Sequence, residues 1–131
     1  MGDYFAHWLN VGKKLKHAPK IYSINWFRTD EAGKFIWPGF GDNIRVMKWV
    51  MDRIEGKVGA KETALGLLPD VKDLDLSGLN IPSETVEKLF AVDPSEWAAE
   101  LRDIETFFNQ FKDRMPTEMR QELDALAAKV G

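Results

Sequence analysis

The stretch KIYSINWFRTDEAGKFIWPGFGDN, residues 20–43, decides how the chain is organised. Its first part alternates apolar with polar residues and is rich in β-formers, which predicts a strand over 20–27. Two breaks follow, a turn at 29–33 and a loop at 37–43, and the loop places Phe40 between two glycines. Aromatic side chains are therefore expected on a strand end and two loops, where regular core packing is scarce.

A helix is expected directly after this stretch. Asp42 or Asn43 can cap its first turn, and Gly56 is expected to end it. The apolar positions that recur at helical spacing are Ile44, Met47, Val50 or Met51, and Ile54. This stripe is the face expected to pack on the rest of the protein.

The flanking segments are mainly helical. The spacing of Tyr4, Trp8, Val11 and Leu15 predicts an amphipathic helix over 3–16. One short strand is expected at 63–68, and the closing helices occupy 82–131. In that last part Asp93-Pro94 and Pro116 each open a helix, and the short link between the two helices predicts an αα-hairpin. The fold class expected is α+β, mainly α.

The charge is unevenly distributed along the chain. Residues 1–60 carry 10 Lys+Arg against 6 Asp+Glu (+4), and residues 61–131 carry 8 against 15 (−7), which gives the net charge of −3. An acidic second half disfavours contact with nucleic acid or an anionic membrane. No cysteine, membrane span or signal peptide is found in the sequence, so we expect a cytoplasmic protein without disulfides.

Residues suited to catalysis are scarce. The two histidines, His7 and His17, are ten residues apart, and no serine lies in a G-x-S-x-G turn. No glycine-rich segment continues as a phosphate-binding P-loop. We therefore expect no catalytic residue and no metal ligand in this chain.

The aromatic residues carry the strongest functional signal. Ten of the fifteen precede residue 50, and Phe27, Phe35 and Phe40 fall in the strand-end and loop segment. Aromatic faces stack on flat heterocycles, and glycine lets backbone approach a ligand closely. Asn43 could add a donor or acceptor for a base edge. On residues alone, these side chains could equally fill a small core beneath the loop.

Three segments carry a resemblance to a known family: DYFAHWL (3–9), INWFR (24–28) and GKFIWPGFGDN (33–43). In order and spacing they resemble the C-terminal part of GTP-dependent phosphoenolpyruvate carboxykinase. The resemblance runs from about residue 2 to about residue 128. Asp42 stands where many relatives have Glu.

The resemblance implies that residues 1–131 are the C-terminal part of a larger α/β nucleotide-binding domain, with residues 20–56 binding guanine. Phe27 and Phe40 would sandwich the base, Phe35 would close the pocket edge, and Asn43 would hydrogen-bond the base. Buried groups matched to one base reject another strongly. GTP or GDP is the ligand implied.

The resemblance also implies the reaction of the intact enzyme, which is expected to be monomeric. That enzyme converts oxaloacetate and GTP to phosphoenolpyruvate, carbon dioxide and GDP in gluconeogenesis, with Mn²⁺ and Mg²⁺ bound by residues upstream of this chain. The chain alone is then an inactive fragment whose partner is the remainder of the enzyme. Two alternatives stay open: a stand-alone helical protein-interaction module, and a single-stranded nucleic-acid platform that the acidic half disfavours.

Overall fold

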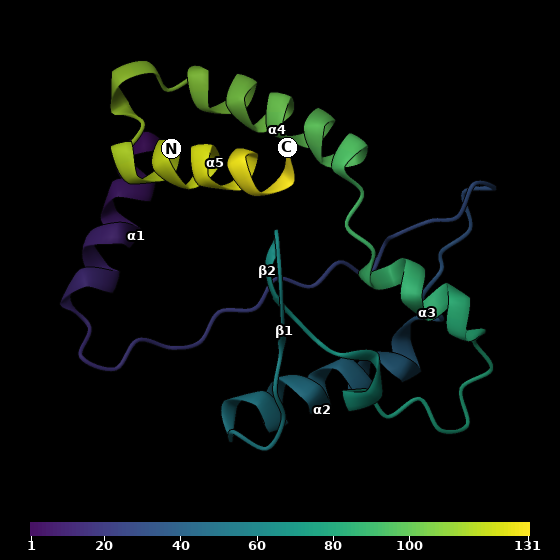
Figure 1. The fold of residues 1–131 in the computed structure, drawn as a ribbon. Coiled ribbons are helices and arrows are strands. Elements are labelled where there is room, and N and C mark those ends of the chain that lie inside the picture. The colour runs from purple at the N-terminus through teal and green to yellow at the C-terminus, as the bar shows by residue number, and fades with distance from the viewer. The chain divides into compact units, whose positions relative to one another are not determined.

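A computed structural model describes residues 1–131 and divides them into two compact units. Unit 1 comprises Met1–Pro19 and Val92–Gly131, and unit 2 comprises Lys20–Ala91. The secondary structure is mainly helical with one two-stranded antiparallel sheet, which confirms an α+β, mainly α fold (Figure 1). No helix is both long enough and apolar enough to cross a membrane.

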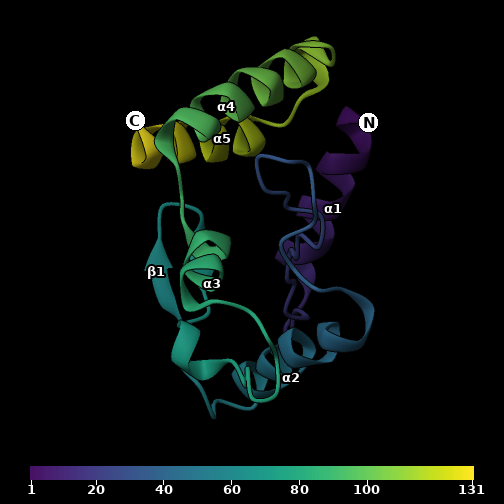
Figure 2. The same cartoon turned by 90° about the vertical axis from the view of Figure 1, so that its right-hand side faces the viewer.

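Unit 1 is built from three α-helices: α1 (Gly2–Lys14), α4 (Pro94–Asn109) and α5 (Thr117–Val130). A short 3-10 turn, η3 (Lys112–Arg114), joins α4 to α5, and the two helices lie side by side in both views (Figures 1 and 2). The predicted αα-hairpin is confirmed. Phe108 of α4 and Val130 of α5 are buried.

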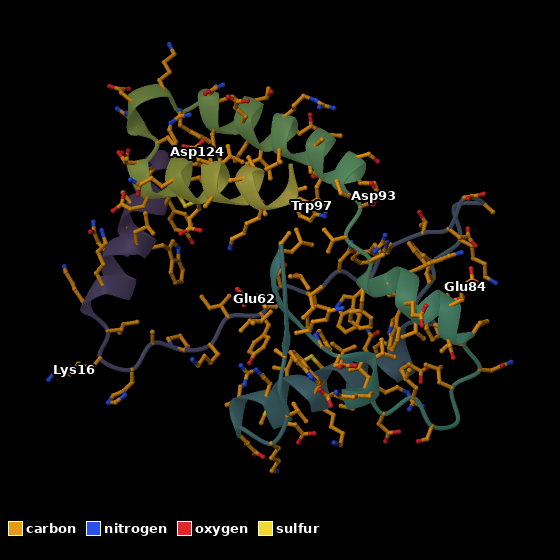
Figure 3. All side chains as sticks on the ribbon, in the orientation of Figure 1. Lys16, Glu62, Glu84, Asp93, Trp97 and Asp124 are labelled. Carbon is orange, nitrogen blue, oxygen red and sulfur yellow. The ribbon has the colours of Figure 1, made fainter.

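The start of α4 follows its predicted capping. The Asp93 carboxylate accepts hydrogen bonds from the backbone N–H of Ser95 at 2.7 Å and of Glu96 at 3.4 Å, and Pro94 occupies the first turn. Asp93 lies at the entrance of α4 and Trp97 one turn further along (Figure 3). A side-chain oxygen at this position satisfies helix N–H groups that have no partner within the helix.

The apolar stripe predicted for α1 is wrong. Tyr4, Trp8 and Leu15 are exposed, and of the predicted positions only Val11 is half-buried. The helix packs through the face that carries Gly2 and Phe5. Gly2 lies against the backbone of Arg114, where a Cβ would sit 2.3 Å from the carbonyl oxygen. Helix α1 has two apolar faces, and helical spacing alone does not decide which one a neighbour covers.

Unit 2 begins with an extended segment in place of the predicted strand. Residues 20–27 contain no strand, so that prediction is wrong. Their burial nevertheless alternates: Tyr22, Ile24 and Trp26 are partly buried, and the residues between them are exposed. The side-chain period of two was read correctly, but no neighbouring strand pairs with this backbone within the chain.

The rest of unit 2 surrounds a small apolar core. Its elements are η1 (Phe40–Asp42), α2 (Asn43–Ile54), β1 (Lys61–Thr63), β2 (Gly66–Leu68), η2 (Val71–Asp73) and α3 (Ser83–Phe90). The single strand predicted over 63–68 is instead a hairpin, with Lys61 opposite Leu68. Trp49, Val50 and Leu74 form the buried cluster, and Tyr22 and Ile24 pack against it.

The stripe predicted for α2 is also wrong in most positions. Trp49 and Val50 are buried, whereas Ile44, Met47, Met51 and Ile54 are exposed. Gly56, with φ +73°, follows the end of the helix as expected. Helix α2 therefore packs through a face centred on Trp49 and Val50 and leaves a second apolar face uncovered in this chain.

Candidate functional site

A small hairpin over residues 28–36 brings Phe27 and Phe35 together. Thr29 and Phe35 form an antiparallel bridge, and the Ile36 N–H donates to the Arg28 carbonyl at 2.9 Å. The Asp30 carboxylate closes the turn by accepting from the backbone N–H of Lys34 at 2.9 Å. The rings of Phe27 and Phe35 meet edge to face, 5.9 Å between centroids.

Both phenylalanines point away from the core of unit 2. Phe27 lies on the exposed side of the alternating segment, opposite to Tyr22 and Ile24, and Phe35 is exposed as well. Phe27 and Phe35 together form an exposed aromatic surface, and the backbone hydrogen bonds of the hairpin hold it in place. Such a surface can contact a flat ring without unpacking the core.

Phe40 lies at the start of η1 and is 98% exposed. The turn depends on Gly39, whose φ of +97° is strained for any residue with a Cβ. The Asp42 N–H donates to the Gly39 carbonyl at 2.9 Å and closes the turn. No ring–ring contact joins Phe40 to another aromatic side chain, so its faces are available to a ligand.

Asn43 is the first residue of α2, one turn after Phe40. Phe40 and Asn43 are three residues apart, and the 3-10 turn η1 leads directly from the one to the other. The indole Nε1–H of Trp37, which is only 7% exposed, donates to Asn43 Oδ1 at 2.9 Å. A buried side chain thus fixes the Asn43 amide.

Arg45 ties the same turn to the rest of unit 2. Its Nε donates to Asp42 Oδ1 at 2.9 Å and its Nη1 to the Asp75 carbonyl at 2.6 Å. Hydrogen bonds from Ser77 lower the pKa of Asp75, and the charge of Arg45 lowers it further. Asp42 accepts its hydrogen bond from Arg45, and Asn43 accepts its hydrogen bond from Trp37. Neither side chain therefore caps α2, and the predicted capping is wrong.

The predicted residues thus fall into two pairs within unit 2. Phe27 contacts Phe35 across the hairpin, and Phe40 shares a turn with Asn43. Arg28 donates to the carbonyl oxygens of Leu89 and Ala91 near the end of α3, so it anchors the hairpin. No three His, Asp or Glu side chains cluster closely enough to hold a metal ion.

Two residues that support this arrangement were not predicted from the sequence. No contact of Trp37 or of Arg45 within the site was predicted from the sequence. The spacing of Asp42 and Arg45, three apart at a helix start, is a sequence signal for their ion pair. The hydrogen bond between Trp37 and Asn43 spans an irregular turn, and no periodicity in the sequence predicts it.

Comparison with known proteins shows the family to which the chain belongs. Residues 1–129 match the family model described as the phosphoenolpyruvate carboxykinase C-terminal P-loop domain. Curated relatives named phosphoenolpyruvate carboxykinase [GTP] include those of Paenarthrobacter aurescens, 46% identical over 99% of this chain, and of Arthrobacter sp. strain FB24, 47% identical over 98%. That of Treponema pallidum is 41% identical over 99%. The chain belongs to the GTP-dependent phosphoenolpyruvate carboxykinase family.

The chain is much shorter than these relatives. It spans 22% of the length of the Paenarthrobacter protein and 21% of the Arthrobacter protein. The names of the relatives describe GTP-dependent enzymes. The part of each relative that matches this chain covers the residues of the site described above.

Proposed function

We propose that unit 2 carries the guanine-recognition site of a GTP-dependent phosphoenolpyruvate carboxykinase. Phe27 and Phe40 stack on the two faces of the base, and Phe35 closes the edge of the pocket beside Phe27. Asn43 hydrogen-bonds the edge of the base. Stacking between aromatic rings and a base contributes about 1–3 kcal/mol per base, which suits side chains exposed in the absence of a ligand.

The observation that carries the proposal is the state of Phe40. It is 98% exposed, yet its turn is held by the Gly39–Asp42 hydrogen bond and by Arg45 on Asp42. A large apolar side chain on a fixed turn, free of core contacts, is a preorganised ligand contact. A core residue would be buried, so the alternative of a core plug is disfavoured for Phe40.

The intact protein is proposed to convert oxaloacetate and GTP to phosphoenolpyruvate, carbon dioxide and GDP, the gluconeogenic direction. The relatives' names support this activity, and their length supports a remainder that supplies the catalytic residues. The His, Asp and Glu residues of this chain do not form a cluster suited to Mn²⁺ or Mg²⁺, so we assign the metal ligands to that remainder. This chain alone is then inactive.

The remainder of the enzyme is also the proposed partner of two apolar surfaces. These surfaces are exposed stripes: Tyr4 and Trp8 on α1 with Leu15 directly after it, and Ile44, Met47, Met51 and Ile54 on α2. Contiguous exposed apolar side chains on a soluble protein mark a contact surface. Since the relatives are several times longer than this chain, the same polypeptide is the proposed occupant.

The test is an alanine series in the full-length enzyme that contains this segment. Phe27→Ala, Phe35→Ala and Phe40→Ala are each compared with Ile21→Ala, which removes a side chain that is 86% exposed outside the proposed pocket. Calorimetry with GDP is expected to show weaker binding for the three phenylalanine variants only. Unchanged affinity across all three would refute the pocket.

A further inference from the structure

In the hydrogen bond between Trp37 and Asn43, the donor and the acceptor are fixed by their chemistry. An indole N–H only donates a hydrogen bond, so the atom of Asn43 that meets Trp37 Nε1 at 2.9 Å must be the amide oxygen. The amide nitrogen Nδ2 then lies on the side away from the indole, and no hydrogen bond within the chain uses it. Trp37 therefore makes the free end of Asn43 a hydrogen-bond donor.

A fixed donor distinguishes the two purine bases. At position 6 guanine presents the acceptor O6, whereas adenine presents the donor N6–H₂. A donor on the protein pairs with the first and leaves two donors facing each other with the second. If the amide could turn over, its oxygen would accept from adenine and the distinction would be lost.

We propose that Trp37 is a positioning residue that sets the base specificity of the site, making it select a 6-oxopurine over a 6-aminopurine through the fixed amide of Asn43. This inference rests on the proposed function, because it requires the base to lie against Asn43. Trp37 itself does not contact the base. Its role is to hold the amide in one of its two orientations.

The second buried tryptophan of unit 2 provides a matched control. Trp49 is 5% exposed and packs in the core cluster, but its Nε1 has no hydrogen-bond partner. Replacement of either tryptophan by phenylalanine removes an indole N–H and reduces the packed volume. Only the replacement of Trp37 also releases the Asn43 amide.

The experiment measures kcat and KM of the full-length enzyme with GTP, ITP and ATP. ITP keeps the oxygen at position 6 and lacks the 2-amino group, so it reports on position 6 separately. For Trp37→Phe we expect the KM for GTP and for ITP to rise about fivefold, the effect of one neutral hydrogen bond. The preference for GTP over ATP in kcat/KM falls, and the change lies in KM rather than kcat. Trp49→Phe keeps the wild-type preference.

A second variant keeps the test decisive if Trp37→Phe folds poorly. Asn43→Asp retains an oxygen for the indole to donate to and replaces the outward nitrogen by an acceptor, so the preference should shift toward ATP. An unchanged GTP-to-ATP preference in Trp37→Phe or in Asn43→Asp would overturn the inference, as would an equal loss in Trp49→Phe. If Phe27→Ala, Phe35→Ala and Phe40→Ala all leave GDP binding intact, the proposed function fails. If these variants weaken GDP binding but the GTP-to-ATP preference never moves in Trp37→Phe and Asn43→Asp, only this inference fails.

Discussion

Replacing Arg45 with methionine tests whether the turn that carries Phe40 and Asn43 is held in place from outside. The Arg45 side chain is 20% exposed, and its guanidinium donates to Asp42 Oδ1 at 2.9 Å and to the Asp75 carbonyl at 2.6 Å. Hydrogen bonds to charged groups contribute about 1.5–3 kcal/mol. Methionine keeps most of the packed volume but leaves the partly buried Asp42 carboxylate without its cation.

We expect Arg45→Met to destabilise the turn locally by about 2 kcal/mol, which corresponds to a roughly thirtyfold larger population of the open turn. Amide hydrogen exchange over residues 39–46 of the full-length enzyme measures this opening. The KM for GTP should rise in the same variant, because Phe40 and Asn43 lose their fixed positions.

The matched control for Arg45→Met is Lys48→Met on the same helix. Lys48 pairs with Asp52 at 2.6 Å, but its side chain is 62% exposed, and exposed ion pairs contribute little. Exchange over 39–46 should therefore stay at the wild-type rate in Lys48→Met. Wild-type exchange in Arg45→Met, or equal acceleration in both variants, would refute the reasoning.

Three further predictions concern the turn, the exposed stripes and unit 1. Gly39→Ala should lower the stability of unit 2 by about 1–2 kcal/mol through its φ of +97° alone, since nothing lies near the added Cβ. The control is Gly41→Ala, where the added Cβ also meets open space but φ is not positive. Thermal denaturation should show a smaller loss of stability for Gly41→Ala than for Gly39→Ala. The 131-residue chain on its own should self-associate through its exposed apolar stripes, and a monomer at every concentration in sedimentation would contradict this. A hydrogen bond from Lys13 lowers the pKa of Glu118. The contact between α1 and α5 should therefore stabilise unit 1 at neutral pH and weaken as the pH falls through that lowered pKa. Lys13→Met should remove this contribution to the pH dependence of unfolding.

The helical hairpin was predictable because its signals are local. Asp93 and Pro94 define the start of α4, and the apolar spacing that continues to Phe108 has one clear face. Capping, proline placement and periodicity all depend on neighbours within a few residues. Agreement among them left no alternative for this part of the chain.

The other elements failed where the deciding contact is not local. The alternation around Tyr22 and Ile24 was read correctly, but a strand also needs a partner, and none is present in this chain. Helices α1 and α2 each carry two apolar faces, and only tertiary contacts determine which one is buried. The apolar pattern of these two helices therefore exceeds what the chain buries by itself.

The candidate site divides in the same way. Phe40 stood out in the sequence because flanking glycines gave it no regular element to belong to, and its exposure agrees with that reading. The roles of Trp37 and Arg45 depend on contacts across an irregular turn. Such contacts follow from the three-dimensional path of the backbone, which residue spacing does not determine.

A crystal structure of the full-length enzyme with bound GDP tests the central claim most directly. We predict that the guanine ring lies between the rings of Phe27 and Phe40, with Phe35 at its edge and the Asn43 amide within hydrogen-bond distance of O6. A guanine ring bound elsewhere, with Phe40 still exposed to solvent, would contradict the assignment of this segment as the base-recognition site.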